Sequence, residues 1–376
     1  MPHNTARIQK QTLVTQLPFF YGWVILAVGT LGVIMTSPGQ TYAVSIFIEH
    51  FIQDLGVSRS LVSTLYAAGT LVGSFALPFV GREIDRRGTR VMVVVIAGIF
   101  GLACIYMGFV RGALTLALGF VAIRMFGQGS LSLVSQNAIN QWWVQRRGTI
   151  LGLSGLFVSL LGLGAFPALI NWLIPQIGWR LTYPLLGALL LLVMAPLGFL
   201  FLRDRPELYG LEPDGRRKSG GGVEDAPPSA PDENWTRGEA LRTPTFWIVT
   251  GGVATSAMMG TGLFFHMVSI FADNGLSADV AASVYLPIAA TTAIVNLGSG
   301  ALVDRIPLRF ALSVALVLLA AALWGAQYLA TVPLAFLYGV TLGASTGLYR
   351  SVAGVAWANY FGRQHLGSIS GTATTI

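Results

Sequence analysis

Long apolar segments dominate this chain and limit what it can fold into. Each is long enough to cross the hydrocarbon core of a bilayer, which needs about 20 residues of helix. Hydrophobic residues make up 54% of the chain and charged residues only 10%, well below the roughly 25% typical of soluble domains. The sequence therefore predicts an all-α polytopic membrane protein. The ten predicted spans are residues 23–48, 58–80, 90–110, 113–137, 149–174, 180–202, 245–271, 279–303, 308–329 and 333–357.

One long polar stretch, residues 203–243, separates the sixth and seventh apolar segments. It contains three consecutive glycines, a Pro-Pro pair and charges of both signs, which is typical of a flexible, largely disordered linker. The predicted division is a cytoplasmic N-terminal segment 1–21, a six-helix bundle 22–202, a cytoplasmic linker 203–243 and a second bundle 244–376.

The Lys and Arg residues cluster in the gaps between apolar segments. With the N-terminus placed in the cytoplasm, 18 of the 23 lie on the cytoplasmic side, three in outer loops and two inside helices. The positive-inside rule favours this orientation, in an inner or plasma membrane. The net charge of +7 is therefore explained by basic residues in cytoplasmic loops, and no nucleic-acid partner is expected.

Several function classes find no support in the residues. The single Cys104 and four scattered histidines form no metal motif. No phosphate-binding G-x-x-x-x-G-K-[ST] loop occurs, and no nucleophile–base pair suggests an enzyme. We therefore expect neither a metal nor a cofactor.

The chain repeats itself at an offset of 219 residues. The pattern from Gly81 to Asp85 and Arg86 recurs from Gly300 to Asp304 and Arg305. Duplicated six-helix halves are a transporter architecture in which the substrate site lies between the halves. At this offset the counterpart of residue 202 is 421. The sequence is therefore interpreted as C-terminally truncated, with about ten helices and the start of helix 11 of a 6+6 arrangement; a natural ten-helix protein is the alternative.

The loop after the second segment reads Gly81-x-x-x-Asp85-Arg86-Arg87-Gly88-x-Arg90. It resembles the signature loop of the major facilitator superfamily. The resemblance implies a twelve-helix fold and a loop that latches the two halves on the cytoplasmic side without contacting substrate. Gly300, Asp304 and Arg305 would form its second copy, in which Ile306-Pro307 replace Arg87-Gly88.

Further landmarks narrow the resemblance to the monocarboxylate transporter and oxalate/formate antiporter group. They are Tyr21-Gly22-Trp23, the stretch from Arg203-Asp-Arg-Pro-Glu207 to Gly210-Leu211, Phe246-Trp247 and Tyr360-Phe361-Gly362. The resemblance implies a small organic anion as substrate. The chain departs from the group at Gln40 and Thr41, near which a lysine is frequent, and at Asn296, where an arginine is frequent.

Two charged residues, Arg124 and Arg350, lie well inside apolar segments, whereas the 16 acidic residues lie in loops, in the linker or at helix ends. Charge within the membrane is costly and marks functional sites. Arginines that face a cavity would attract an anion and could bind a carboxylate bidentately. Arg124 could instead bond to the backbone of a neighbouring helix, and Arg350 could reach water at the helix end.

Other polar residues could line the same cavity. Pro38-Gly39 should break the first helix and free backbone carbonyls beside Gln40 and Thr41. The further candidates are Tyr66, Gln128, His266 and Asn296, each of which could equally serve helix packing. Trp142-Trp143 is interpreted as part of an interfacial aromatic belt.

The sequence thus predicts a secondary active transporter, monomeric in the lipid bilayer, that moves a mono- or dicarboxylate by alternating access. Symport with protons and exchange for a counter-anion both stay open. The alternatives are an exporter of drug-like or neutral solutes and a membrane sensor that has kept the fold without transport.

Overall fold

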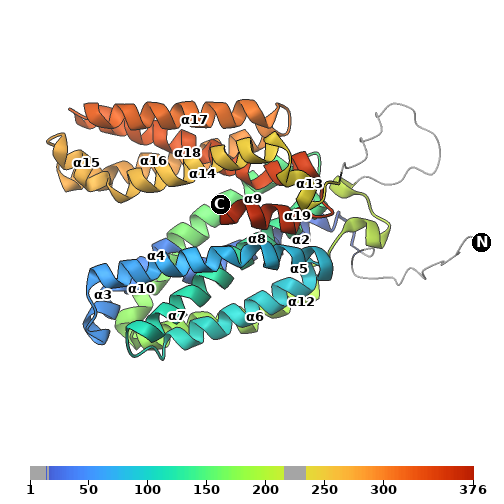
Figure 1. Ribbon diagram of the computed structural model, residues 1–376, viewed down its shortest axis with the longest axis horizontal. Coiled ribbons are helices and arrows are strands. Elements are labelled where there is room, and N and C mark those ends of the chain that lie inside the picture. The colour runs from blue at the N-terminus through green and yellow to red at the C-terminus, as the bar shows by residue number, and fades with distance from the viewer. Residues whose placement is uncertain (1–13, 15–16, 216–233) are drawn as a thin grey trace, which may run out of the picture.

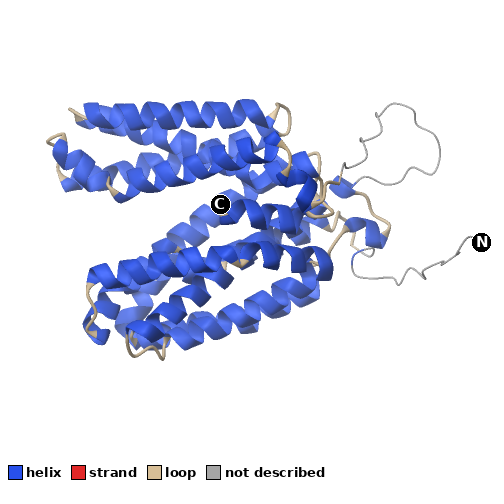
Figure 2. Ribbon diagram, viewed as in Figure 1, coloured by secondary structure: helices blue, strands red, loops and turns tan. Residues whose placement is uncertain are grey.

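The computed structural model describes residue 14 and residues 17–215 and 234–376 of the chain (Figure 1). Helices and connecting loops make up these residues, and no strand occurs among them (Figure 2). Eight helices there are long and apolar enough to cross a membrane, or nine when the pair α4 (Arg59–Phe75) and α5 (Leu77–Arg87), bent by 40°, is one span. The all-α membrane fold is confirmed.

In the first half, several spans are built from consecutive helical pieces. The first breaks at a 3₁₀ turn, Ser37–Gly39, where Pro38 cannot donate a backbone hydrogen bond, as the sequence predicted. Three later spans contain π-helical segments, Arg124–Leu131, Val158–Ala165 and Leu190–Met194. Besides α4 and α5, the pieces are α2 (Gly22–Ile34), α3 (Thr41–Leu55), α6 (Thr89–Met107), α7 (Ala113–Ile123), α8 (Ser132–Trp142), α9 (Arg147–Phe157), α10 (Phe166–Ile177), α11 (Trp179–Leu189) and α12 (Ala195–Phe201).

The second half contains four helices of 18 to 30 residues and two shorter ones. They are α14 (Pro244–Phe265), α15 (Met267–Asp273), α16 (Ala278–Val303), α17 (Leu308–Gly325), α18 (Val332–Phe361) and α19 (Leu366–Thr375). The seventh predicted span is helical as α14 and α15, which meet at His266, but it is not one of the nine spans above.

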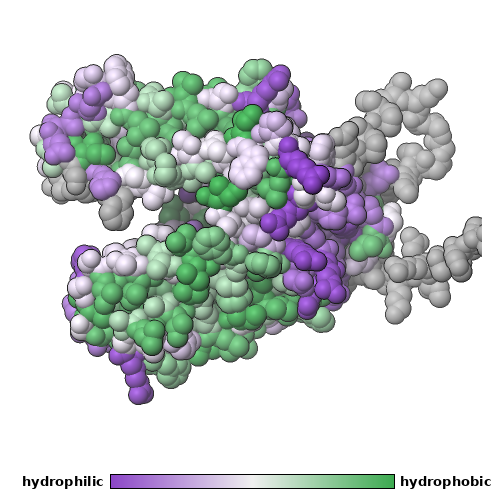
Figure 3. Space-filling view, viewed as in Figure 1, coloured by the Kyte–Doolittle hydropathy of each residue, from purple (hydrophilic) through white to green (hydrophobic). Residues whose placement is uncertain are grey.

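The two halves form two lobes that meet at one end of the molecule (Figure 1). There α5 packs against α19, and α9 packs against α16. We call this end the linker side, because the described ends of the linker lie there. Toward the other end, a hollow separates the lobes in the space-filling view (Figure 3). The molecule is therefore closed on the linker side and open on the opposite side.

Both described ends of the linker are ordered, unlike the disorder predicted for residues 203–243; residues 216–233 lie outside the described part. Short helices form at Pro206–Tyr209, Pro213–Gly215 and α13 (Arg237–Leu241). Asp204 accepts hydrogen bonds from the Thr89 hydroxyl and the Arg90 N–H. Asp214 accepts from the N–H groups of residues 144–146. Asp204 therefore satisfies an N–H group in the first turn of α6, and Asp214 satisfies N–H groups of the loop that leads into α9. Composition did not reveal either function.

Trp142 and Trp143 do not form an interfacial belt, so that prediction is wrong. Both indoles are buried and pack against Phe20, at ring-centroid distances of 5.8 and 5.1 Å. Their N–H groups donate to the carbonyls of Arg203 and Gly22. Partners for both indole N–H groups within the fold make burial favourable.

Candidate functional site

Two aspartates join the halves on the linker side. Asp85, in the last turn of α5, accepts hydrogen bonds from the Gly367 and Ser368 N–H groups at 2.7 Å each. Asp304, at the end of α16, accepts from the Gly148 N–H at 2.6 Å and from the Thr149 N–H and hydroxyl at 2.9 and 2.7 Å. Each carboxylate therefore lies at the positive N-terminus of a helix in the opposite half, α19 or α9.

Glycines allow the close approach that these bonds need. A Cβ on Gly81 would overlap the carbonyl oxygen of Gly367, and one on Gly300 would overlap that of Gly148. Gly81, Gly300, Asp85 and Asp304 thus lie together at the inter-half contact.

The remaining residues of the predicted gating loop lie outside these glycine contacts. Arg86 and Arg87 pair with Glu83, one turn back on α5. Gly88 has φ +86°, and the Arg90 Nε donates to the Phe199 carbonyl. Arg305 is exposed in the turn after Asp304.

Arg124 is 6% exposed and is held by α4 and by the 3₁₀ turn that breaks the first span. Its Nε donates to the Thr70 hydroxyl at 2.7 Å, and its Nη1 donates to the Gly39 carbonyl at 3.0 Å. Its guanidinium lies 4.7 Å from the centre of the Tyr66 ring, within cation–π range. Arg124 therefore binds one of the carbonyls freed at the predicted break of the first helix.

Several predicted site residues gather around this break. The Tyr66 hydroxyl donates to Thr41 at 2.9 Å, and the Gln40 amide donates to Thr36 at 2.9 Å. Gln128, one turn beyond Arg124, has a buried Oε1 without a hydrogen-bond partner among the described residues. Arg124, Gln128, Tyr66, Thr41 and Gln40 form a polar region of the first half.

Arg350 lies on α18 in the other half and is exposed. It is within electrostatic range of the Tyr42 hydroxyl, which is 3.0 Å from Ser37 at the helix break. Four residues beyond Arg350, Gly354 approaches Leu151 of α9. Arg350 therefore faces the first half. The sequence analysis missed Tyr42 and Ser37, although both flank the flagged Pro38-Gly39 pair.

Two predicted site residues lie apart from this region. Asn296 is buried on α16; its Oδ1 accepts from the Ser351 hydroxyl at 2.8 Å, and its amide approaches Gly155 of α9. His266 is exposed where α14 meets α15.

A further contact on the linker side was missed. Arg363, in the loop before α19, donates to the Gln141 carbonyl at 2.6 Å and to Glu207 at 2.7 Å. Gln141 in turn donates to the Arg363 carbonyl at 2.7 Å. The sequence analysis had marked the stretches around Pro206 and Tyr360, but nothing in the sequence predicted that they lie close together.

Comparisons with known proteins agree with this architecture. The family model for the Major Facilitator Superfamily matches residues 18–376. The oxalate:formate antiporter of Oxalobacter formigenes is 24% identical over 258 residues, which is 69% of this chain and only 57% of that relative's length.

Two solved structures share the fold. The human organic anion transporter MFSD10 (TETRAN) superposes with a TM-score of 0.65 and 14% identity, over 96% of this chain and 92% of that one. The proton:xylose symporter XylE gives a TM-score of 0.62 at 14% identity, over 94% and 86%. Because the family model covers residues 18–376, the chain belongs to the Major Facilitator Superfamily, and it is a multi-pass membrane protein.

Proposed function

We propose that the chain carries a small organic anion, a mono- or dicarboxylate, by alternating access. The observation that carries this proposal is the position of Arg350. This residue is exposed, lies on a membrane helix and faces the opposite half. Within the described residues, no carboxylate lies within 4.0 Å of Arg350 or of Arg124. An uncompensated guanidinium within a membrane protein favours an anionic ligand.

The two arginines have different functions in this proposal. Arg350 would contact the anion, because this residue is exposed. Arg124 would add positive potential while it holds the helix break, because its bonds to Thr70 and Gly39 already use part of its donor set. Tyr42, Thr41 and Gln40 would complete the first half's wall of the site.

Exchange of anions fits the distribution of acidic groups. In the described membrane helices, acidic residues lie within the first or last two turns, so no carboxylate there is a central proton carrier. The oxalate:formate antiporter is an exchanger by name, and the MFSD10 structure is titled an organic anion transporter. Both support an anionic substrate. We also propose that the linker side is cytoplasmic and that the protein works as a monomer without a cofactor.

The test is uptake in proteoliposomes. Vesicles loaded with unlabelled formate, lactate or oxalate are offered the labelled anion, with and without a pH gradient. We expect uptake that depends on the internal anion and that falls at least about tenfold in Arg350→Gln, since a charge-assisted bond contributes about 1.5–3 kcal/mol. Arg237→Gln, which changes an exposed arginine on α13, is the control.

Other outcomes would contradict the proposal. Unchanged exchange by a correctly inserted Arg350→Gln protein would remove Arg350 from the site. Uptake driven only by the pH gradient would exclude exchange and direct attention to His266. Uptake of neutral or drug-like solutes with no carboxylate uptake would replace the anionic substrate, and binding without transport would indicate a sensor.

A further inference from the structure

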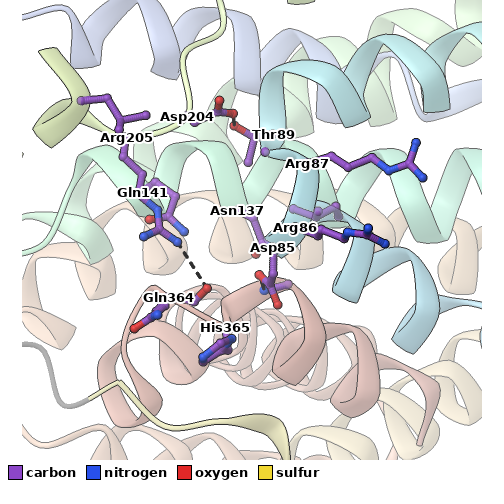
Figure 4. Close-up of a pocket in the computed structure, with 14 residues that line it drawn as sticks. Asp85, Arg86, Arg87, Thr89, Asn137, Gln141, Asp204, Arg205, Gln364 and His365 are labelled. Atoms are coloured by element: carbon purple, nitrogen blue, oxygen red, sulfur yellow. Dashed lines mark hydrogen bonds between the residues drawn. The ribbon is translucent and has the colours of Figure 1, made fainter. Parts of the chain in front are cut away.

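Three amide side chains near the C-terminal end of α8 face the contact between the halves. They are Asn137, Asn140 and Gln141, which lie on one face of the helix because they are three and four residues apart. Each is buried, with at most 6% of its surface exposed. Asn137 and Gln141 lie beside a cavity of about 420 Å³ on the linker side, whose walls come from both halves (Figure 4). We call these three residues the amide stripe.

One end of each amide forms a hydrogen bond with the second half. All three partners lie on α18, on α19 or in the loop between them. The bonds run from the Ser370 hydroxyl to the Asn137 Oδ1 at 3.5 Å, from the Asn140 Nδ2 to the Gly354 carbonyl at 3.1 Å, and from the Gln141 Nε2 to the Arg363 carbonyl at 2.7 Å. The Asn137 bond is the weakest, because 3.5 Å is longer than a hydroxyl bond usually is. The amide stripe is therefore covered by the second half only while the linker side is closed.

The other end of each amide has no partner. The Asn137 Nδ2, the Asn140 Oδ1 and the Gln141 Oε1 are fully buried and lack a hydrogen bond within the described residues. Water in the neighbouring cavity therefore does not reach these atoms. Buried polar atoms are usually paired, and an unpaired one costs its lost hydration, which exceeds what a typical hydrogen bond between neutral groups returns. The amide stripe therefore opposes closure.

Opening of the linker side removes this cost. When the halves separate, water reaches both ends of each amide, so no polar atom of the stripe stays unpaired. The Asp85 and Asp304 contacts act in the opposite direction, because they are charge-assisted bonds between the halves. A protein with two states responds to a ligand when its minor state stays populated, at about 0.1–10%. Closure that relied on the aspartates alone would depopulate the open state.

We propose that the amide stripe destabilises the closed state, offsets the two aspartate contacts and so allows the linker side to open. This inference rests on the alternating access proposed above, but it does not depend on the identity of the substrate. It also gives the amide stripe the opposite sign from the aspartate contacts. Removal of its polar atoms strengthens closure, whereas removal of either aspartate charge weakens it.

The first experiment measures the populations of the two states by double electron–electron resonance on the full chain in phosphatidylcholine nanodiscs. Spin labels are attached in a Cys104→Ala background at Arg82→Cys and Arg242→Cys, two exposed positions in opposite halves. Asn137→Leu keeps the branched shape of the side chain and removes its unpaired atom together with the weakest of the three bonds. We expect this variant to lower the open-to-closed ratio at least about fivefold.

Two further variants separate polarity from packing. Asn137→Asp keeps the shape and places a charge at the buried position, so it should raise the open-to-closed ratio at least about tenfold. Ser135→Ala is the matched control. The Ser135 hydroxyl is also buried on α8 without a described partner, but it packs against Gly32 of α2 in the same half. Its surroundings stay the same when the halves separate, so its removal should leave the ratio unchanged.

The second experiment repeats these measurements in an Asp85→Asn background, in which the linker side should open more often. Asn137→Leu should there return the ratio toward that of the chain with Asp85 intact, and Ser135→Ala should not. The second background keeps the effect measurable even when the chain with Asp85 intact is almost entirely closed.

Two outcomes would overturn the inference. One is a ratio that Asn137→Leu does not lower in either background. The other is a ratio that Asn137→Leu and Asn137→Asp both raise, which would show that Asn137 serves packing alone. The proposed function fails in a different way. Absence of opening in every variant, Asp85→Asn included, would reject alternating access itself. Normal opening without carboxylate uptake would reject the substrate and leave the function of the amide stripe intact.

Discussion

Two contacts join the halves on the linker side, one made by Asp85 and one by Asp304, and we call them the first and the second latch. Both have an aspartate at a helix N-terminus, but the residues that follow the aspartate differ. In the first, Asp85 binds the start of α19, followed along the chain by Arg86, Arg87 and Gly88. In the second, Asp304 binds the start of α9, followed by Arg305, Ile306 and Pro307. By sequence the second copy departs from the signature, yet its aspartate makes the same contact and gains the Thr149 hydroxyl.

This comparison separates the motif residues that contact the opposite half from the motif residues that do not. A glycine one turn before each aspartate lets two backbones touch, and the aspartate supplies the charge-assisted bonds. The first copy's Arg87 forms its ion pair on its own helix, with Glu83. Gly81, Asp85 and their counterparts should therefore control closure, and Arg87 should contribute little.

The largest effect is expected from the glycines. Gly81→Ala or Gly300→Ala places a methyl group inside the carbonyl of the facing helix, which should cost the closed state about 1–3 kcal/mol or more. Leu133 is 7% exposed and packs against Gly371 of the other half. In a Cys104→Ala background, a Leu133→Cys thiol should therefore react with a soluble maleimide only when the linker side opens. In both glycine variants this labelling should become fast, and transport should be lost. Gly98→Ala on α6, where the added methyl group meets no atom within 4 Å, should change neither. Slow labelling in either variant would show that the glycine contact does not limit closure.

The second largest effect is expected from the two aspartates. Asp85→Asn and Asp304→Asn each keep the shape and lose the charge, so each should destabilise the closed state by about 2 kcal/mol, roughly thirtyfold in labelling rate. Asp273→Asn, at the end of α15 on the open side, is the control. If only Asp85→Asn had an effect, the equivalence of the two latches would fail.

A smaller effect should distinguish the second latch from the first. Thr149→Val removes the hydroxyl that donates to Asp304 at 2.7 Å and should cost about 1 kcal/mol, near fivefold in the same labelling assay. Thr149→Ser keeps the hydroxyl and should restore slow labelling. Equal labelling by the valine and serine variants would mean that the two backbone bonds suffice.

The sequence predicted most of the fold because lipid requires long apolar helices, and the 219-residue repeat marked Asp85 and Asp304 as equivalents. It also predicted the break at Pro38. It could not decide whether Arg124 binds backbone or faces a cavity, since its Gly39 partner lies 85 residues away. The partners of Asn296 and of the ordered linker ends could not be predicted for the same reason. They lie on distant segments, and such contacts produce no local pattern in the sequence.

The arginines of the signature loop should have the smallest effect. The Arg86 and Arg87 side chains are 75% and 58% exposed, and exposed ion pairs with a residue three or four positions away contribute about 0.5 kcal/mol or less. Arg87→Gln should therefore change the labelling rate less than about threefold. A change as large as that of Asp85→Asn would mean that Arg87 stabilises the contact between the halves. The second latch has Ile306 at that position, so the two latches would then not be equivalent.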